Sequence, residues 1–323
     1  MGVRELMSTY LRQARFFILL SLLAASAAVR VAAGEFAFSY AVAGPTKDLR
    51  FGQPSGIVVS ERLDALYLAD IKESAVYSMD LHGVSRPTDM SNEKFVEPYA
   101  LALDAEGSLY VTLSETAPIK VIAPGGRTSS IELPRPEGDA PPSPGRMAFD
   151  RDGNLYVVDR ANCRLYVLDR DRKLKLRLGS EGSRRGEFRR LQDVAVDRQG
   201  RIYALDSVGV PVQVFDSKGK YLDRFGFHGE GSQDIGNPSA IALDRNEQVW
   251  IADRGRHSLV VFDRAGEFLR RFGVYGVGEG MIFDPVDIEI DAFGRVYVVE
   301  GEARRMQVFT VGHPYESFGT FDF

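Results

Sequence analysis

Ser239-Ala-Ile-Ala-Leu-Asp244 and Gln248-Val-Trp-Ile-Ala-Asp253 are two short runs of alternating side chains that decide the fold of this chain. Each run ends in Asp, and a polar turn joins the two. Alternation over five or six residues predicts two strands of one antiparallel hairpin. The same pair of runs is written six times along the chain, centred on Tyr67, Tyr110, Tyr156, Tyr203, Trp250 and Tyr297.

The spacing of these copies predicts the architecture. The last three intervals between the central aromatic residues are each 47 residues long. In the later copies a third run ends in Phe-Asp, at residues 215–216 and 262–263, and a more polar fourth run follows. A repeat of about 40–50 residues with four short strands is the signature of a propeller blade. We therefore expect an all-β protein, a six-bladed β-propeller of four-stranded antiparallel blades.

The first strand of each copy has the composition of a strand that lines a central channel. Small residues alternate with Val, Ile or Leu, which suits strands that crowd together around an axis. These six inner strands are expected at residues 55–60, 99–104, 146–150, 192–197, 239–244 and 286–291.

One domain is expected from residue 36 to residue 323, because a closed ring of small sheets shares one continuous core. The composition is 44% hydrophobic and 26% charged, which is ordinary for a folded domain. We expect the ring to close by exchange of a terminal strand. Residues 36–44 are expected to complete the sixth blade beside residues 306–309, and the tail at residues 315–323 is the alternative.

Residues 1–33 have the pattern of a secretory signal peptide. Arg4, Arg12 and Arg15 precede an apolar run at residues 16–29, and small residues follow it. The run has 14 residues, fewer than the roughly 20 that cross a bilayer, so cleavage is expected and an uncleaved anchor is the alternative. This predicts export to the periplasm or cell envelope of a bacterium, with no membrane span once the segment is removed.

The exported chain is expected to be acidic. Removal of residues 1–33 takes away four Arg and one Glu, so 36 basic and 44 acidic residues remain and the formal net charge changes from −5 to −8. A net negative chain binds nucleic acid and anionic membranes poorly. We therefore expect no nucleic-acid partner, and we expect a monomer.

The later copies resemble NHL repeats. Phe225-Gly226, Asn237-Pro238-Ser239, residues 241–244, residues 250–253 and residues 261–263 look like successive parts of one such repeat, and the third to sixth copies share most of this pattern. The resemblance implies a six-bladed propeller that serves mainly as a binding platform. A few similar propellers are enzymes, notably peptidyl-hydroxyglycine amidating lyase and the gluconolactonase-like hydrolases.

The histidines do not support the lyase resemblance, which implies several His that converge on the channel. The chain has His82, His228, His257 and His313. His228 and His257 are expected on one face of the ring and the other two on the opposite face, so a three-His zinc site is not predicted. Cys163 is the single cysteine, and no catalytic constellation surrounds it. We assign no catalytic residue, metal ligand or cofactor; a divalent metal such as Ca²⁺ or Zn²⁺ in the channel belongs to the enzyme alternative.

A carboxylate ends the second strand of most copies. A ring of carboxylates could hold Ca²⁺, but equivalent positions on different blades are separated by the channel width, and Ca²⁺ needs six or more oxygens within about 2.5 Å. We expect these side chains to accept amide hydrogens in the following turn, as structural acids near the channel. They are Asp70, Asp159, Asp206, Asp253 and Glu300.

Arginines gather in the loops expected on one face of the ring. Guanidinium groups bind carboxylates, sulfates and phosphates through forked hydrogen bonds, so this face is the candidate binding surface. The alternative is a solvated rim of loops. The ten arginines are Arg160, Arg164, Arg184, Arg185, Arg189, Arg190, Arg254, Arg256, Arg304 and Arg305.

The sequence thus predicts an exported propeller that acts as a protein-binding or assembly scaffold through its arginine-rich face. A protein is the expected partner, and an anionic polysaccharide is the second candidate. The alternative function is a metal-dependent enzyme, a lyase or a lactonase-like hydrolase, with its site at the central channel.

Overall fold

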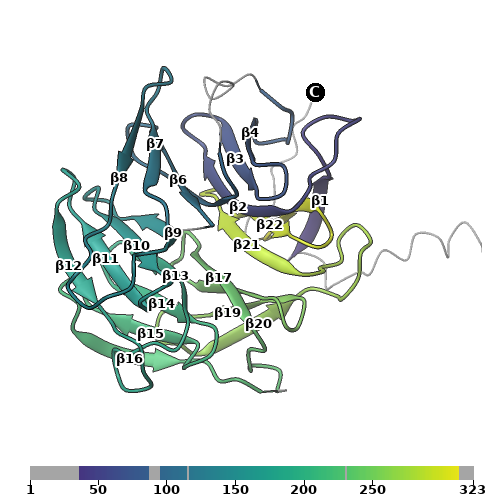
Figure 1. Ribbon diagram of the computed structural model, residues 1–323. Coiled ribbons are helices and arrows are strands. Elements are labelled where there is room, and N and C mark those ends of the chain that lie inside the picture. Colours follow the sequence, from purple (N-terminus) through teal and green to yellow (C-terminus); the bar gives the residue numbers. More distant parts are fainter. Residues whose placement is uncertain (1–35, 87–94, 115, 230, 313–323) are drawn as a thin grey trace, which may run out of the picture. The chain divides into compact units, whose positions relative to one another are not determined.

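The computed structural model describes residues 36–86, 95–114, 116–229 and 231–312. These residues form six small antiparallel sheets, the blades, which are arranged around a centre (Figure 1). Blades 1 to 3 consist of β2 (Pro54–Ser60), β3 (Ala65–Asp70) and β4 (Ala75–Met79); β5 (Pro98–Leu103), β6 (Leu109–Leu113), β7 (Ile119–Ile122) and β8 (Thr128–Ile131); and β9 (Pro144–Phe149), β10 (Leu155–Asp159), β11 (Arg164–Leu168) and β12 (Leu174–Leu178).

Blades 4 to 6 repeat this arrangement. They consist of β13 (Leu191–Val196), β14 (Ile202–Asp206), β15 (Val212–Phe215) and β16 (Tyr221–Phe225); β17 (Pro238–Leu243), β18 (Val249–Asp253), β19 (Ser258–Phe262) and β20 (Phe268–Phe272); and β21 (Pro285–Ile290), β22 (Arg295–Glu300) and β23 (Arg305–Thr310), joined by β1 (Ala37–Val42). The all-β six-bladed propeller expected from the sequence is confirmed. Blade 1 has three strands in the described part of the chain, and the fourth strand expected after β4 falls where residues 87–94 lie outside it.

The first strand of each blade lies at the inner edge of its sheet and packs beside the first strands of both neighbouring blades. Contacts between β2 and β21 close this inner ring. Because successive strands are antiparallel, the loops fall on two faces. The connector face carries the blade-to-blade connectors and the second-to-third strand turns, and the hairpin face carries the other two kinds of turn.

The N-terminal strand closes the ring. β1 lies beside β23 at the outer edge of blade 6, in the order β1-β23-β22-β21. The expectation that residues 36–44 complete this blade is therefore confirmed. The competing tail at residues 315–323 and the signal segment at residues 1–33 lie outside the described residues.

In blades 2 to 6 the recurring aromatic residue and the recurring Asp form one clamp. In blade 5, one carboxylate oxygen of Asp244 accepts the Gln248 amide hydrogen at 2.9 Å, and the other accepts Trp250 Nε1–H at 3.1 Å. The same Asp thus fixes the hairpin turn and orients the buried ring of the second strand. Equivalent pairs are Tyr110–Asp104, Tyr156–Asp150, Tyr203–Asp197 and Tyr297–Asp291.

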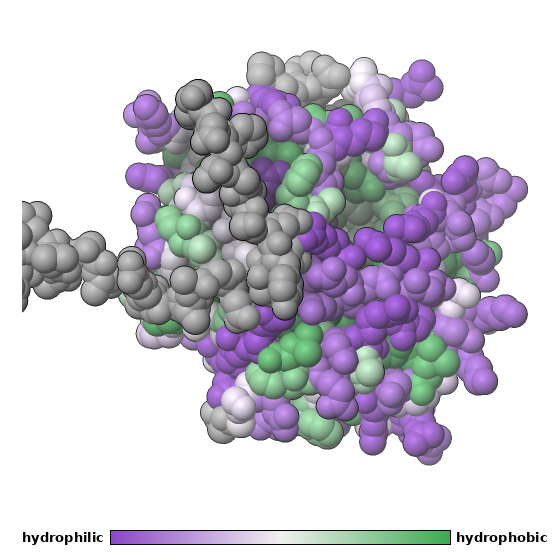
Figure 2. All heavy atoms as spheres, turned by 180° about the vertical axis from the view of Figure 1, so that it is seen from behind, coloured by the Kyte–Doolittle hydropathy of each residue, from purple (hydrophilic) through white to green (hydrophobic). Residues whose placement is uncertain are grey.

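The core lies between neighbouring blades, where the faces of the second and third strands meet. Trp250 and Tyr203 are among the largest fully buried side chains. The face seen in Figure 2 is mainly hydrophilic, with hydrophobic groups in separate patches. In the described part of the chain, no helix is long and apolar enough to cross a membrane.

Candidate functional site

The carboxylates that end the second strands are buried hydrogen-bond acceptors. Asp253 accepts the amide hydrogens of Gly236 and Asn237, each at 3.0 Å, and pairs with Arg271 Nη1 at 3.1 Å. Glu300 accepts the Phe283 amide hydrogen at 2.6 Å, pairs with Arg305 and accepts from Gln307 Nε2 at 2.8 Å. Each of the five carboxylates therefore joins the end of the second strand of its blade to the connector that leads into that blade. The other three are Asp70, Asp159 and Asp206.

None of these five acids is among the described residues that line the central channel. Each second strand lies one strand outward from the inner edge of its blade, and its terminal carboxylate accepts hydrogen bonds from a connector. Six of the ten candidate arginines also have partners within the propeller.

Arg305 is buried and pairs with Glu300, so it is not part of any surface. Backbone carbonyls and carboxylates of neighbouring connectors satisfy the other five, which means that they stabilise the connector face instead of presenting free guanidinium groups. Their partners are Ser114 O for Arg160 at 2.7 Å, Asp139 for Arg164, Asp284 for Arg254, Gly231 O for Arg256 at 2.5 Å and Gly52 O for Arg304 at 2.8 Å.

The remaining four arginines lie on the connector from β12 to β13. Arg185 lies over the Tyr221 ring at 5.5 Å. Arg184, Arg189 and Arg190 are exposed, and their guanidinium groups make no hydrogen bond or ion pair with the described residues. These three side chains contribute to two adjoining hollows of about 380 and 220 Å³, which share residues including Gly182, Ser183 and Arg189, and Arg224 lines the smaller one.

The backbone of this connector is held firmly, although three of its arginines have no partner among the described residues. Phe188 is fully buried, and its amide donates to Ser180 O at 2.9 Å. The amides of Arg189 and Arg190 donate to Asp206 at 2.6 and 3.0 Å. Glu187 is also occupied, because its carboxylate accepts the Ser183 and Arg184 amide hydrogens at 3.1 and 2.9 Å. The connector therefore presents fixed Cα positions from which flexible cationic side chains extend.

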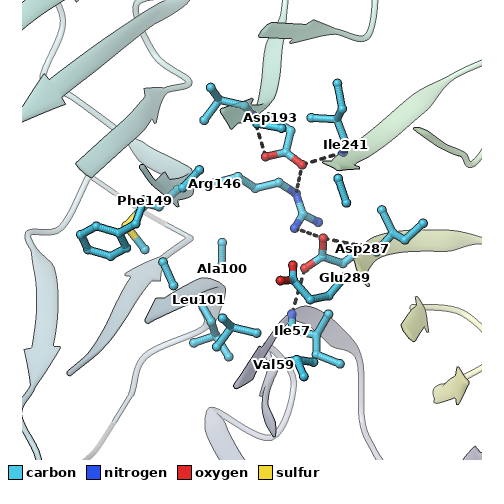
Figure 3. Close-up of a pocket in the computed structure, with 18 of the residues that line it drawn as sticks. Ile57, Val59, Ala100, Leu101, Arg146, Phe149, Asp193, Ile241, Asp287 and Glu289 are labelled. Carbon is cyan, nitrogen blue, oxygen red and sulfur yellow. Dashed lines mark hydrogen bonds and ion pairs between the residues drawn. The ribbon is translucent and has the colours of Figure 1, made fainter. Parts of the chain in front are cut away.

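A second concave site is the central channel. A cavity of about 300 Å³ is lined by the later residues of all six inner strands, so it lies toward the hairpin face (Figure 3). The accessible surface of this cavity is mostly polar, although most of its lining residues have apolar side chains. The exceptions are Arg146 of β9, Asp193 of β13 and Asp287 and Glu289 of β21.

Arg146 spans the channel between three other blades. Its residue exposure is 5%, and its Nη1 lies 2.5 Å from Asp287 Oδ1. Nη2 donates to Val286 O at 2.5 Å and to Ser55 O at 3.3 Å. Nε lies 3.9 Å from Asp193 Oδ2 and has no hydrogen-bond acceptor among the described residues.

The two aspartates cap the free inner edges of neighbouring strands. Asp287 Oδ2 accepts the Ile57 amide hydrogen at 2.8 Å, and Asp193 Oδ2 accepts the Ile241 amide hydrogen at 2.9 Å (Figure 3). Burial raises the pKa of Asp193 to about 7, and the charge of Asp287 adds to this shift. Arg146 opposes it through its positive charge.

Glu289 faces the cavity without a partner. Its carboxylate makes no hydrogen bond or ion pair with the described residues, and it lies beside Asp287 (Figure 3). Burial raises the pKa of Glu289 well above its usual value, and the charges of Asp287 and Asp193 raise it further. A carboxyl group in this setting can donate a proton or accept a cation.

The channel residues do not fit a divalent metal site. Both Asp193 and Asp287 already accept backbone amides, and Arg146 pairs with them. Glu289 is the remaining carboxylate, whereas a divalent cation needs several oxygen ligands. No group of three or more His, Cys, Asp or Glu in the described ranges has the arrangement of a metal site.

The histidines have separate environments. His228 hydrogen-bonds the carbonyls of Gly209 at 2.9 Å and Ile235 at 3.2 Å. His257 accepts the Asp284 amide hydrogen at 2.9 Å and stacks on Phe283, with ring centroids 5.0 Å apart. Neither lines the channel cavity. His82 is exposed, and His313 lies outside the described residues.

Sequence reasoning missed the four charged channel residues, although a signal was present. When the inner strands are aligned, Arg146, Asp193 and Asp287 occupy the position of Gly56 and Ala100, and Glu289 replaces an Ala or Val two residues later. One cation and two anions at equivalent small-residue positions are expected to meet across the axis.

Two family models match parts of the chain. A model described as a six-bladed β-propeller matches residues 148–223, and the NHL repeat model matches residues 236–262. A search of the curated proteins found no match to this chain.

Solved structures share the fold at low sequence identity. Virginiamycin B lyase from Staphylococcus aureus has a TM-score of 0.59 and 14% identity, covering 86% of this chain and 100% of its own. A gluconolactonase from Xanthomonas campestris has a TM-score of 0.63 and 17% identity, covering 86% and 95%. A protein of unknown function from Bacteroides thetaiotaomicron has a TM-score of 0.65 and 15% identity, covering 83% and 72%. The repeat pattern, the six blades and the two family matches together show that this chain is a six-bladed β-propeller in which residues 236–262 match the NHL repeat.

Proposed function

We propose that this propeller is a protein-binding or assembly scaffold that recognises an acidic segment of its partner on the connector from β12 to β13. The observation that carries the proposal is the contrast among the ten arginines. Six are satisfied within the propeller, whereas Arg184, Arg189 and Arg190 extend from a rigid connector without partners among the described residues.

Charge and shape both favour a carboxylate-bearing segment. Guanidinium groups bind carboxylates through paired hydrogen bonds, and an exposed cluster accelerates the encounter with a partner of opposite charge. The two adjoining hollows of about 380 and 220 Å³ provide room for several side chains next to these cations. The net charge of the chain is −5, so this local positive site would orient an acidic partner toward one part of the connector face.

The setting in which this binding would occur follows from the leader-like residues 1–33. We propose that the propeller acts in the periplasm or cell envelope as a monomer, with no nucleic-acid partner and no bound cofactor. An anionic polysaccharide would present carboxylates or sulfates of the same chemistry, and it is one of the outcomes that the following experiment distinguishes.

The test is crosslinking in the native host, followed by mass spectrometry of the captured material. The variant changes Arg184, Arg189 and Arg190 to Ala. We expect a specific protein partner to be lost from this variant, while the midpoint of thermal unfolding stays close to wild type because exposed substitutions seldom exceed about 0.5 kcal/mol.

The matched control changes three exposed arginines of hairpin-face turns, Arg62, Arg151 and Arg245, to Ala. It removes the same charge and should retain the partner. Equal loss in both triple variants would indicate a nonspecific effect of charge, and equal capture by wild type and the connector variant would refute the proposal. Capture of glycan without protein would assign the connector to a polysaccharide.

A second candidate function is an enzyme with its site in the channel, a lyase or lactonase-like hydrolase. The observation that favours it is Glu289, a carboxyl group with a raised pKa that faces a cavity of about 300 Å³. Similar folds occur in a virginiamycin B lyase and a gluconolactonase. Turnover of a lactone or cyclic ester by the purified protein, abolished by Glu289→Gln, would support this candidate, and absence of turnover across a lactone panel would count against it.

A further inference from the structure

We propose that the channel cavity is a binding site for a small aliphatic ammonium ion, with Glu289 as the anionic partner. This site lies toward the hairpin face and uses none of the connector arginines, so the inference does not depend on the proposed scaffold function.

The cavity has aliphatic side chains around its mouth and charged side chains at its floor, and its accessible surface is mostly polar. Around its mouth, the sixth residue of each inner strand is apolar in all six blades, and Phe149 provides the largest of these side chains. At the level of Glu289 the equivalent residues of blades 2 to 5 are all Ala, which leaves space beside the carboxylate. A volume of about 300 Å³ corresponds to roughly ten water molecules at about 30 Å³ each, so a short alkyl chain and its head group fit.

The floor of the cavity has more negative than positive groups. Arg146 faces three carboxylates, those of Asp193, Asp287 and Glu289. The aspartates are engaged by Arg146 and by the Ile57 and Ile241 amides, whereas the Glu289 carboxylate has no donor among the described residues. The ligand that completes this arrangement brings a positive charge and hydrogen-bond donors.

A second polar group at the floor is also incomplete. Arg146 is only 5% exposed, and its Nε has no hydrogen-bond acceptor in the described part of the chain. A buried polar group without a partner costs about 1–3 kcal/mol, so such groups normally meet water or a ligand. An ammonium ion has no acceptor for the Arg146 Nε–H, so the open position that calls for a cationic ligand is the Glu289 carboxylate alone.

An ammonium group fits these features better than other ligand heads. An anion would meet three carboxylates, and a divalent metal would lack oxygen ligands because both aspartates are occupied. An ammonium carries three donors, one for Glu289 and others for the inner-edge carbonyls of the first strands, which have no strand partner on the channel side. The alkyl chain would lie against the apolar mouth.

The protonation of Glu289 links this binding to pH. The charged groups that face it are Asp287, Asp193 and Arg146 at the floor, with Glu61 and Asp291 at the turns above. A neutral carboxyl cannot form the ion pair, so affinity for an ammonium ion rises as pH increases through the raised pKa of Glu289. The ammonium ion itself stays protonated in this range, as lysine does.

The experiment is calorimetric titration of the purified full chain with n-butylammonium at about pH 8.5, beside butyrate and n-butanol as ligands with the same alkyl chain. We expect a dissociation constant of about 1 mM for n-butylammonium, a value that five non-hydrogen atoms can reach. Binding of butyrate or n-butanol should be at least about tenfold weaker. Equal binding of all three, or no binding of n-butylammonium, would overturn the proposal.

The test variant is Glu289→Gln. Its matched control is Glu106→Gln, which removes an exposed carboxylate from a hairpin-face turn. Glu289→Gln should weaken n-butylammonium binding at least about tenfold, and Glu106→Gln should leave it unchanged. Ala148→Val narrows the cavity while keeping every charge, so it should also weaken binding, and it keeps the proposal testable if Glu289→Gln does not fold.

The pH dependence separates an ion pair from a purely structural role of Glu289. As the pH is lowered from about 8.5, wild-type affinity should fall several-fold, and the residual affinity of Glu289→Gln should fall less, because Asp193, with a pKa of about 7, still titrates at the cavity floor. Wild-type affinity that does not change with pH, or unchanged binding by the Gln variant, would refute the assignment.

Discussion

Replacement of Arg146 by Met tests whether the channel network stabilises the ring. Met keeps most of the length of the side chain but removes the ion pair with Asp287 at 2.5 Å and the hydrogen bonds to the carbonyls of Val286 and Ser55. The two aspartates then remain buried without a cation. Breaking a buried ion pair from one side costs about 3–5 kcal/mol, so we expect a loss of that size in the free energy of unfolding at pH 7.

The loss should depend on pH with a defined sign. In the variant, Asp193 lacks the guanidinium that favours its charged form, so its folded-state pKa rises further above that of the unfolded chain. Stability from such groups is fully present below the unfolded pKa near 3.8 and is lost as pH rises through the folded pKa, which for Asp193 is already about 7 in the wild type. The variant should therefore be destabilised less at pH 5 than at pH 7.

The assay is urea unfolding of wild type and Arg146→Met at pH 5 and pH 7, with thermal unfolding as a second measure. At roughly 2–4 °C per kcal/mol for a domain of this size, the midpoint temperature should fall by about 10 °C at pH 7. Asp193→Asn and Asp287→Asn, added to Arg146→Met, should restore part of the stability because they remove the buried charges. A variant within about 1 kcal/mol of wild type at pH 7, or an equal loss at both pH values, would refute the reasoning.

Three further predictions follow from other contacts. Asp253→Ala leaves the Gly236 and Asn237 amides and Arg271 without their acceptor, so it should lower the urea-derived free energy of unfolding by about 3 kcal/mol; a loss under 1 kcal/mol would contradict this. Deletion of residues 36–44 removes β1 and exposes the edge of β23, so the chain should unfold at lower urea, and a synthetic 36–44 peptide should partly restore the midpoint; no change on deletion would count against strand closure. Burial raises the pKa of the Cys163 thiol, so it should react with a disulfide reagent at pH 8 several-fold more slowly than the urea-unfolded chain; equal rates would contradict the buried environment.

The repeated features of the propeller could be predicted from the sequence because each repeat is a local rule. The Asp244–Trp250 clamp spans six residues, and its copies recur at the repeat period, so six blades and their strand order follow from short-range chemistry. Closure of the ring by β1 could also be predicted from the sequence, because residues 36–44 have the pattern of a strand but belong to none of the six repeats.

The candidate sites could be predicted only in part. The arginines could be placed in connector-face loops from the sequence. That Arg256 donates to Gly231 O, and that the Arg184 guanidinium has no partner among the described residues, could not be predicted, because both depend on angstrom-scale loop geometry. The channel network was missed because Arg146 and Asp287 are far apart in sequence and come together through ring closure alone. A charge in place of a small inner-strand residue was the available signal.

The pairing of β1 with β23 imposes an order on folding. β1 ends at Val42, whereas β23 ends at Thr310, so the outer strand of the last blade is made first and its partner is made last. At about 5–20 residues per second, the ribosome needs on the order of tens of seconds to synthesise the intervening chain. Blades 1 to 5 can form during this interval, but the sixth cannot be completed, and the first waits with an unpaired side. Assembly of this ring therefore ends with one long-range step that joins the two ends of the folded chain, and this step is expected to set the folding rate.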